Sequence, residues 1–571
     1  MKKWVILNSL KINSIVSSKA IKDIIHILLE NRGLKKQKEI NEFLSPSVES
    51  LTIEKVGLNE KELHNAKVRI LKAIENNETI VVYTDYDVDG VSSGTIAWEV
   101  LYHLGAKVMP YVPHRIEEGY GLSNIGIDNV KKQFNPSLII TVDHGVSAYA
   151  QVGYAKKLGV DVIIIDHHTL PSKLPEVEAL IHTVSLCATG IAWFFANYLK
   201  SNKKSAENLD LVALATIADL IPLTHTNRIL VKYGLEQFNK TKRLGLLALM
   251  KTSGIKEGNI GVYEVGHMLA PRINASGRLT HALDSLRLLC TKDKARAESL
   301  AQNLSLTNRN RQLLLQETYA HALETVKKEF ITDNKSLRQL NKLIIVSHTS
   351  YNQGVIGLVA GKLVDEYYRP AIVIAEGEKY SKASARSIAG FNIVEAIRSC
   401  SELLVNVGGH PMAAGFTIET SKILFLEKKL KKIAENSLDG EKLQRVLKID
   451  CEINLERVTP ELYRAIKELE PFGMGNSVPT FVSKKVKVVK MRIIGKDKKH
   501  LKFTLQPNPK FHQYIDAIGF GMSSFFETFS FDQNIDIVYT IEEDHWNMNR
   551  NWSNLGSSLQ LKLKDVNISE S

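Results

Sequence analysis

Three aspartates at alternate positions follow a short run of β-branched residues, and they are the residues of this sequence best suited to chemistry. Residues 80–82 (Ile-Val-Val) predict a buried strand, and Asp85, Asp87 and Asp89 follow soon after it. In an extended chain this spacing places the three carboxylates on one side, where they repel each other unless cations neutralise them. Because carboxylate oxygens are hard ligands that suit Mg²⁺, Mn²⁺ or Ca²⁺, the stretch predicts a metal site at the carboxyl end of a strand.

An EF-hand loop and a solvated acidic turn are the ordinary alternatives for this stretch. An EF-hand begins with a similar pattern, but it follows a helix and needs a bidentate Glu at its twelfth position, which here is Ile96. A solvated turn is the usual fate of Asp-Gly clusters, but aspartates that abut a fully apolar strand are unusual in hairpin turns. The rest of the chain favours the metal site over both.

Groups that can bind metal ions recur where three further hydrophobic segments end. They are Asp143 after residues 137–142, Asp166-His167-His168 after residues 160–165, and Asp219 after residues 211–218. Because the carboxyl ends of parallel strands meet at one edge of a sheet, four such sites are expected to converge there. Several carboxylates and an imidazole favour two divalent cations over one.

The elements that position these groups follow from the alternation of strand-like and helical segments after residue 80. This alternation predicts a parallel α/β sheet. Gly90 and Gly94 are expected to turn the chain sharply into a helix that Ser92 or Ser93 caps.

Four motifs resemble those of the DHH phosphoesterase family: Asp85-Tyr86-Asp87-Val88-Asp89-Gly90, Thr141-Val142-Asp143, Asp166-His167-His168 and Ala218-Asp219-Leu220-Ile221-Pro222-Leu223. Over nearly its full length the chain resembles the RecJ-type members of that family, which are single-strand-specific 5′→3′ DNA exonucleases. This narrower resemblance rests on Asn31-Arg32-Gly33, Phe43-Leu44-Ser45-Pro46 and residues 111–122, 271–279 and 470–476. It implies an α/β fold with a DHH lobe, a connecting helix, a DHHA1 lobe and a C-terminal OB-like β-barrel. It also implies a hydrolase that acts in DNA repair and recombination.

The resemblance implies roles for individual residues. Two Mn²⁺ or Mg²⁺ ions would be held by Asp85, Asp87, Asp89, Asp143, His167 and Asp219. His168 would orient the metal ligands or face the phosphate. The 5′-terminal phosphate would be held by Arg115, Ser384 and Arg386, where Gly408 and Gly409 allow the backbone to approach it. Arg278 and His410 would lie near the scissile phosphate.

The sequence departs from the family pattern in two places. Many DHH proteins carry a metal-binding His four residues before the middle Asp, and that position is Tyr83 here. The segment after His168 is short and lacks an expected Asn-Pro. Neither departure removes one of the ligands named above.

The predicted domains are a helical region at 1–75 packed on the DHH lobe, the DHH domain at 76–280, a connecting helical segment at 281–335, the DHHA1 domain at 336–440 and an OB-fold at 445–571. Short alternating strands after residue 445 predict the barrel. Nine basic residues occur in it between 484 and 502, and six rings accompany them: Phe503, Phe511, Tyr514, Phe520, Trp546 and Trp552. Basic groups interleaved with aromatic rings suit single-stranded nucleic acid, and any single ring is more often a core residue.

Composition limits the class of protein. The 571 residues carry a formal net charge of +12, which suits a polyanionic partner such as single-stranded DNA. No apolar run is long enough to span a bilayer, so no membrane partner is expected. The four cysteines form no CxxC pair, so neither disulfides nor structural zinc are indicated and a cytoplasmic location fits best.

The resemblance also suggests a single-strand-binding protein and a RecQ-type helicase as partners. Two alternative functions remain at this point. One is another DHH phosphodiesterase, such as a nanoRNase or a cyclic-dinucleotide phosphodiesterase, and the other is a non-catalytic replication scaffold. The intact motifs and the C-terminal barrel favour the exonuclease.

Overall fold

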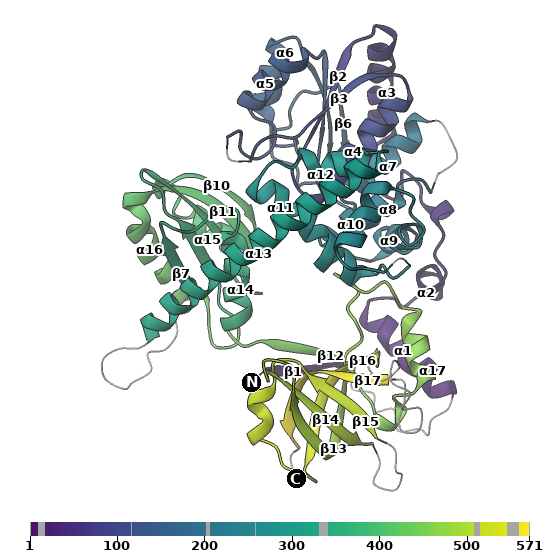
Figure 1. Cartoon of the computed structure of the whole chain (residues 1–571), viewed down its shortest axis with the longest axis vertical. Coiled ribbons are helices and arrows are strands. Elements are labelled where there is room, and N and C mark those ends of the chain that lie inside the picture. The colour runs from purple at the N-terminus through teal and green to yellow at the C-terminus, as the bar shows by residue number, and fades with distance from the viewer. Residues whose placement is uncertain are drawn as a thin grey trace. The chain divides into compact units, whose positions relative to one another are not determined.

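The structure is a computed structural model that describes residues 2–8, 18–115, 117–200, 206–256, 258–330, 341–507, 514–544 and 559–569. The chain folds into two compact units (Figure 1). One unit comprises residues 51–221 and 233–445, and the other comprises residues 1–50, 222–232 and 446–571. Within the described residues, no helix is long and apolar enough to cross a membrane.

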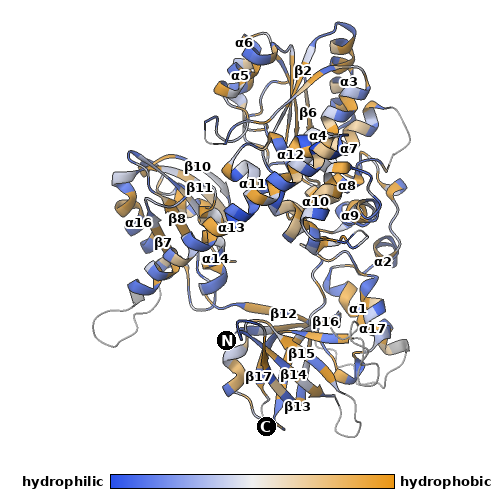
Figure 2. Cartoon of the chain, in the orientation of Figure 1, coloured by the Kyte–Doolittle hydropathy of each residue, from blue (hydrophilic) through white to orange (hydrophobic). Residues whose placement is uncertain are grey.

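The unit of residues 51–221 and 233–445 contains two five-stranded sheets. The first sheet is entirely parallel, has the order β3-β2-β4-β5-β6, and consists of β2 (Thr79–Thr84), β3 (Lys107–Tyr111), β4 (Leu138–Val142), β5 (Asp161–Asp166) and β6 (Ala179–His182). Its strands are largely hydrophobic, as the orange colour in Figure 2 shows, and β2 and β4 are buried along their whole length. The predicted parallel α/β sheet is therefore confirmed.

Helices cover both faces of this sheet. The α-helices between residues 60 and 290 are α3 (Glu60–Glu75), α4 (Val88–His103), α5 (Asn124–Phe134), α6 (Tyr149–Lys157), α7 (Ala188–Leu199), α8 (Leu209–Ala218), α9 (His225–Phe238), α10 (Leu244–Thr252), α11 (Ala270–Leu279) and α12 (Leu283–Cys290). A core of apolar side chains joins α5 and α6 to one face of the sheet. α4 and α7 contact strands β2 and β5 and lie beyond the other face (Figure 1).

Helix α4 begins earlier than predicted. It starts at Val88 with Asp87 as its N-cap, so Ser92 and Ser93 lie inside the helix and do not cap it. Gly90 and Gly94 are also helical, and they are needed for close packing rather than for a turn. A Cβ on Gly90 would lie 2.6 Å from the carbonyl oxygen of Asp85, and one on Gly94 would lie 2.2 Å from Cγ2 of Thr84.

The second sheet has the order β10-β11-β9-β8-β7, and only β7 and β8 are parallel. Its strands are β7 (Ile344–His348), β8 (Ala371–Ala375), β9 (Tyr380–Arg386), β10 (Leu404–His410) and β11 (Ala413–Glu419). Its helices are α14 (Ile356–Tyr367), α15 (Ile393–Arg398) and α16 (Ile423–Ser437). The predicted connecting segment is α12 and the 37-residue helix α13 (Lys294–Phe330), and its last residues, 331–335, lie outside the described residues.

The other unit contains a closed five-stranded barrel. Its strands are β13 (Phe481–Ile494), β14 (His500–Gln506), β15 (Ile515–Gly519), β17 (Leu559–Ile568) and β16 (Asn534–Glu543), and pairing of β13 with β16 closes it. β12 (Val446–Glu452) pairs with β13 outside the barrel. The predicted mixed α/β chain with a C-terminal barrel is confirmed.

The N-terminal residues differ from the expectation of a purely helical region. Lys3–Asn8 form strand β1, which pairs in parallel with β12, because its alternating apolar side chains Trp4 and Ile6 pack beside the barrel. α1 (Ser18–Asn31), α2 (Gln37–Leu44) and α17 (Pro460–Lys467) share one hydrophobic core with the barrel strands.

Signature segments far apart in the sequence meet in this unit. Arg32 donates hydrogen bonds to Oδ1 of Asn476 (2.7 Å) and to the carbonyl of Ser477 (2.6 Å). Arg228 lies 3.8 Å from the ring centre of Phe43 and donates to the carbonyls of Glu468 and Glu470. These segments therefore hold the unit together rather than supplying chemistry.

Candidate metal centre and phosphate cavity

The aspartates that follow β2 separate because α4 begins between them. Asp85 lies in the turn after β2, and Oδ1 of Asp87 accepts hydrogen bonds from the amides of Asp89 (2.9 Å) and Gly90 (3.1 Å). Asp89 is already in the first turn of the helix. The spacing predicted that the three carboxylates lie on one side of an extended segment. This prediction is wrong, because Asp89 is part of a helix.

The carboxylates instead divide between groups that could each hold a metal ion. One group is Asp85, Asp87 and Asp143, a second is Asp89, His167 and Asp219, and a third is Asp143, His167 and His168. In each group, one ligand atom of every residue lies within 4.8 Å of the others. Overlapping groups of this kind fit the prediction of two neighbouring cations.

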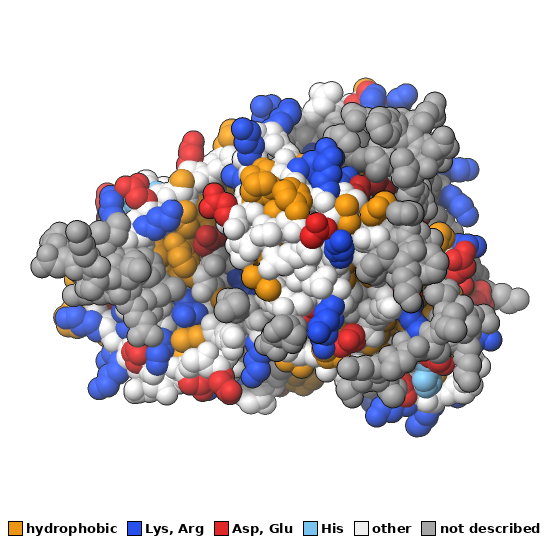
Figure 3. Space-filling view, turned by 90° about the horizontal axis from the view of Figure 1, so that it is seen from below, with side chains coloured by type: hydrophobic (Ala, Val, Ile, Leu, Met, Phe, Trp, Pro, Cys, Tyr) orange, Lys and Arg blue, Asp and Glu red, His pale blue; other side chains and the backbone are white. Residues whose placement is uncertain are grey.

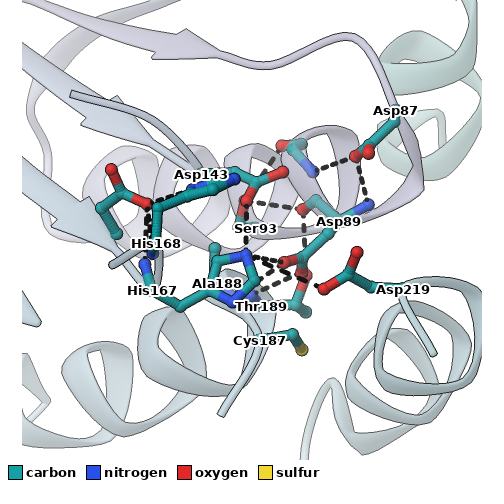
Figure 4. Close-up of polar contacts among 12 residues, drawn as sticks. Asp87, Asp89, Ser93, Asp143, His167, His168, Cys187, Ala188, Thr189 and Asp219 are labelled. Carbon is teal, nitrogen blue, oxygen red and sulfur yellow. Dashed lines mark hydrogen bonds and ion pairs between the residues drawn. The ribbon is translucent and has the colours of Figure 1, made fainter. Parts of the chain in front are cut away.

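His167 lies where these groups meet (Figure 4). Its Nε2 is 3.2 Å from Oδ1 of Asp143 and 3.8 Å from Oδ2 of both Asp89 and Asp219. Asp143 has a left-handed backbone conformation, with a φ of +67°. Asp219 is the C-cap residue of α8. All six predicted metal ligands are therefore brought together.

The N-terminus of α7 fixes Asp89. Oδ2 of Asp89 accepts from the amide of Ala188 (2.7 Å), and Oδ1 accepts from the amide (2.8 Å) and the hydroxyl (2.6 Å) of Thr189. Amides at a helix start bind anions well. Thr189 was not predicted from the sequence, although a polar residue at the start of an apolar helix was a usable signal.

His168 is held in place by Asp166. Oδ1 of Asp166 lies 2.7 Å from Nδ1 of His168, and the hydroxyl of Tyr120 lies 3.3 Å from the other ring nitrogen. Burial tends to raise the pKa of Asp166, but the hydrogen bond and charge of His168 outweigh it and the pKa lies well below its usual range. Burial lowers the pKa of His168, and Asp166 more than offsets this, so the net shift is upward.

The buried carboxylates lack enough donors of their own and so fit a cation. Oδ1 of Asp85 and, apart from its contact with His167, Oδ1 of Asp143 have no hydrogen-bond partner among the described residues. Burial, followed by the charges of neighbouring aspartates, raises the pKa of both residues well above the usual value, and it raises the pKa of Asp219 to about 8. Carboxylate and imidazole ligands of this kind suit Mn²⁺ or Mg²⁺.

Tyr83 has a structural role. Its side chain is fully buried on β2 beside Tyr111 and His144, at ring-centre distances of 5.0 and 5.2 Å. Its hydroxyl occupies the space where a Cβ of Gly126 would lie. It belongs to none of the metal-binding groups found among the described residues.

A second feature is a cavity of about 750 Å³ between the first sheet's loops and the second sheet. Of the residues predicted to bind the substrate, it is lined by Arg115, Arg278, Ser384, Arg386 and Gly408. No acidic side chain is among the described residues that line it. Burial, followed by the charge of Arg115, lowers the pKa of Arg278 to about 10, as expected for cations gathered without anions.

Two predicted residues lie outside this cavity. Gly409 and His410 are exposed near the end of β10 and do not line it. His410 pairs with Ala413, which pairs with Arg386, so it lies two strands away from that guanidinium. Their roles stay predictions.

Several residues that line the cavity were not predicted from the sequence. Lys382, Thr417, Tyr86 and Tyr120 line it. Lys382 shares a strand face with Ser384 and Arg386 at a spacing of two, and that alternation was a readable signal.

The barrel has the predicted basic residues, but several are paired with carboxylates. Lys484 contacts Glu452 (2.9 Å), Lys487 contacts Asp532 (3.0 Å) and Lys502 contacts Asp516 (2.6 Å). Positive side chains on the face seen in Figure 3 are spread among acidic and hydrophobic ones rather than gathered in one patch.

The predicted rings of the barrel differ in their exposure. Phe503 is buried, whereas Phe520 is exposed beside His500 and Lys562. Tyr514 is also exposed. Phe511, Trp546 and Trp552 lie outside the described residues.

Comparison with known proteins agrees with these features. Family models match residues 79–216 (DHH family, N-terminal domain), 340–436 (DHHA1 domain) and 449–565 (RecJ OB domain). The single-stranded-DNA-specific exonuclease RecJ of Bacillus subtilis is 35% identical, over 98% of this chain and 70% of its own length. RecJ of Haemophilus influenzae is 30% identical, over 92% and 93%.

Solved structures agree as well. The crystal structure of RecJ in complex with Mn²⁺ from Thermus thermophilus matches all of this chain and 80% of its own, with a TM-score of 0.82 at 25% identity. A second structure of that protein was solved with Mg²⁺ and has a TM-score of 0.76. The metal centre, the arginine-lined cavity and the barrel agree with these comparisons. The chain therefore belongs to the RecJ family of single-stranded-DNA-specific exonucleases.

Proposed function

We propose that this chain hydrolyses single-stranded DNA from its 5′ end with two divalent metal ions, Mn²⁺ or Mg²⁺. The observation that carries this proposal is the convergence of His167 and five aspartates. The same unit contains a cavity that is lined by arginines and has no acidic side chain among its described lining residues. When bound, the metal ions supply Lewis-acid activation of water and stabilise charge on the scissile phosphate.

The chain's own residues have distinct roles in this proposal. Asp85, Asp87 and Asp143 hold one ion, and Asp89, His167 and Asp219 hold the other. Asp166 fixes the ring orientation of His168, and the hydroxyl of Tyr120 contacts its second nitrogen. We assign His168 to orient the metal ligands or to face the substrate phosphate. We assign Arg278 and His410 to the surroundings of the scissile phosphate.

Binding of the 5′-terminal phosphate in the cavity accounts for the proposed 5′→3′ direction of degradation. Arg115, Ser384 and Arg386 line the cavity, and Gly408 leaves the backbone accessible beside them. A guanidinium binds a dianionic terminal phosphate more strongly than an internal diester, which carries a single charge. Anchoring that end sets the first scissile bond at a fixed distance from it.

Digestion of labelled strands tests this proposal. Strands labelled at the 5′ or at the 3′ end are incubated with Mn²⁺ and with EDTA, using the wild type and Asp143→Ala. We expect the 5′ label to be released first as a mononucleotide, with no release in EDTA or with Asp143→Ala, while Asp143→Ala still binds the strand. Release of the 3′ label first would reverse the assigned direction, and undiminished turnover by Asp143→Ala would remove this residue from the centre.

The two alternative functions fit less well. A nanoRNase or cyclic-dinucleotide phosphodiesterase does not need the barrel that the RecJ OB model matches at residues 449–565. A silent scaffold does not need six metal ligands brought together, and it does not need the hydrogen bonds from Thr189 that fix Asp89.

We also propose that the chain works in the cytoplasm, in DNA repair and recombination, with a single-strand-binding protein and a RecQ-type helicase. The resemblance to RecJ-type exonucleases suggests these partners, and the four cysteines, which form no disulfide and are mostly buried, support a reducing compartment. Co-sedimentation of the purified proteins without DNA tests the partners, and absence of a complex would argue against direct contact.

A further inference from the structure

One face of the second sheet presents small residues to the cavity. Ser384 on β9 pairs with Gly415 on β11, which pairs with Gly408 on β10. A Cβ on Gly408 would meet no atom within 4 Å, and one on Gly415 would meet only the carbonyl oxygen of Ala383, at 3.7 Å. This row is therefore an open floor on which a phosphate can approach the backbone.

A polar row lies next to this floor. Lys382, Thr417 and Asn406 pair in the same order across the three strands, and all three line the cavity. Nζ of Lys382 donates a hydrogen bond to Oγ1 of Thr417 (2.8 Å). Since this row is two residues along each strand, it lies about 7 Å from the floor.

The polar row lies at the end of the cavity that is farther from the metal centre. At the other end, Arg386 is close enough to Arg278 to affect its pKa, and Arg278 in turn is near Asp87. A Cβ on Gly357 would lie 2.9 Å from Oγ of Ser384 and 3.1 Å from Nη2 of Arg386, so α14 closes the sheet face at that end. Lys382, by contrast, is exposed.

We propose that Lys382, Thr417 and Asn406 form a second anion subsite, which takes the additional phosphates of a strand whose 5′ end is a diphosphate or triphosphate. This inference rests on the proposed function, because the terminal phosphate at Ser384 and Arg386 defines where further phosphates go. The rest of the strand runs from that position toward the metal centre. Only a group attached to the terminal phosphate itself extends the other way, toward Lys382.

The reaction on such an end is the same hydrolysis. The oxygen of water bonds to the phosphorus of the first diester, and the bond from that phosphorus to the 3′ oxygen of the first nucleotide breaks. The 3′ oxygen takes a proton. The products are a nucleoside 5′-triphosphate and a shortened strand with a 5′-monophosphate.

Synthetic single-stranded DNA with a 5′-triphosphate, a 5′-monophosphate or a 5′-hydroxyl tests the inference in the full-length enzyme with Mn²⁺. The variants are Lys382→Ala and Thr417→Val, and the control is Lys379→Ala, an exposed lysine that does not line the cavity. We expect the wild type to release a nucleoside triphosphate from the first strand. Losing the lysine contact should raise KM for the triphosphate strand about tenfold relative to the monophosphate strand. Thr417→Val should do so to a smaller extent and Lys379→Ala not at all.

The outcomes separate this inference from the proposed function. If the wild type degrades 5′-monophosphate strands but not 5′-triphosphate strands, or first releases pyrophosphate, the subsite is refuted while the exonuclease remains. The same holds if the ratio of the two KM values is unchanged in Lys382→Ala. If no 5′ end is degraded, the proposed function itself fails.

Discussion

Buried carboxylates at the metal centre carry charges that the metal-free fold accommodates poorly. The pKa of Asp219 is raised to about 8 by burial, followed by the charges of Asp89 and Asp87. Because this value lies above that of an unfolded chain, the metal-free fold takes up a proton, and its free energy of unfolding falls as the pH rises from about 4 to about 8.

Asp219→Asn should therefore stabilise the metal-free protein. In EDTA we expect a higher Tm than for the wild type, with a larger gain at about pH 8.5 than at about pH 5. With Mn²⁺ present the order should reverse, since the variant lacks a ligand. Thermal melts at the two pH values check this, with the exposed Asp497→Asn as control. A gain that is equal at both pH values would show that the carboxylate is not the cause.

Arg386 is the residue on which the direction of degradation depends. Arg386→Ala should reduce cleavage of 5′-phosphorylated strands at least tenfold more than cleavage of 5′-hydroxyl strands, because it removes a bidentate contact to the terminal phosphate. Arg386→Lys should recover only part of this loss, because it restores charge without the planar fork. Initial rates on the two strands give the comparison. Equal impairment of both would make Arg386 a contact to the backbone in general.

At the scale of elements, the close approach of α4 to the turn after β2 determines how the metal ligands Asp85 and Asp87 are positioned. A Cβ on Gly90 would lie 2.6 Å from the carbonyl oxygen of Asp85. Gly90→Ala should therefore push α4 away, separate Asp85 from Asp87, and lower the stability by about 1–3 kcal/mol. We expect weaker Mn²⁺ binding in titration calorimetry and a large loss of kcat.

Gly153→Ala provides the matched control. Gly153 also lies inside a helix, but a Cβ there would meet no atom within 4 Å. This variant should keep full activity and melt no lower than the wild type, because alanine favours the helix. If Gly90→Ala behaved in the same way, contact between α4 and the turn would not be what positions the ligands.

At the scale of the whole molecule, the barrel is expected to supply affinity for the strand rather than chemistry. Truncation near residue 445 is a poor test, because residues of α1 and α2 share their core with the barrel strands and would lose it. Charge substitutions in the full chain avoid this problem.

Replacing Lys490, Arg492 and Lys498 with Gln should weaken binding to long strands and flatten its salt dependence. These side chains are exposed and have no carboxylate partner among the described residues, and each phosphate contact contributes roughly 0.7 to the slope. The control replaces Lys484, Lys487 and Lys502, which are paired with carboxylates. Affinities over a range of salt concentrations check this, and an unchanged slope would make the basic stretch an ordinary solvated surface.

The sequence by itself determined the ligand types, the parallel sheet and the barrel. Ligands such as Asp143 and His167 follow apolar strands, and the carboxyl ends of parallel strands meet at one edge. Period-two patterns after residue 445 likewise fixed the barrel strands. These features depend on residues close together in the chain, so they could be predicted.

Tertiary structure alone decided how the ligands are grouped and what the glycines do. Asp87 caps α4, which sends Asp89 toward Thr189 and His167, about 100 and 80 positions away in the sequence. Strand β1 finds its partner in β12, more than 400 residues later. The row of Lys382, Thr417 and Asn406 exists only through the register of three strands. Such contacts depend on packing between distant segments, which the local pattern of a sequence does not encode.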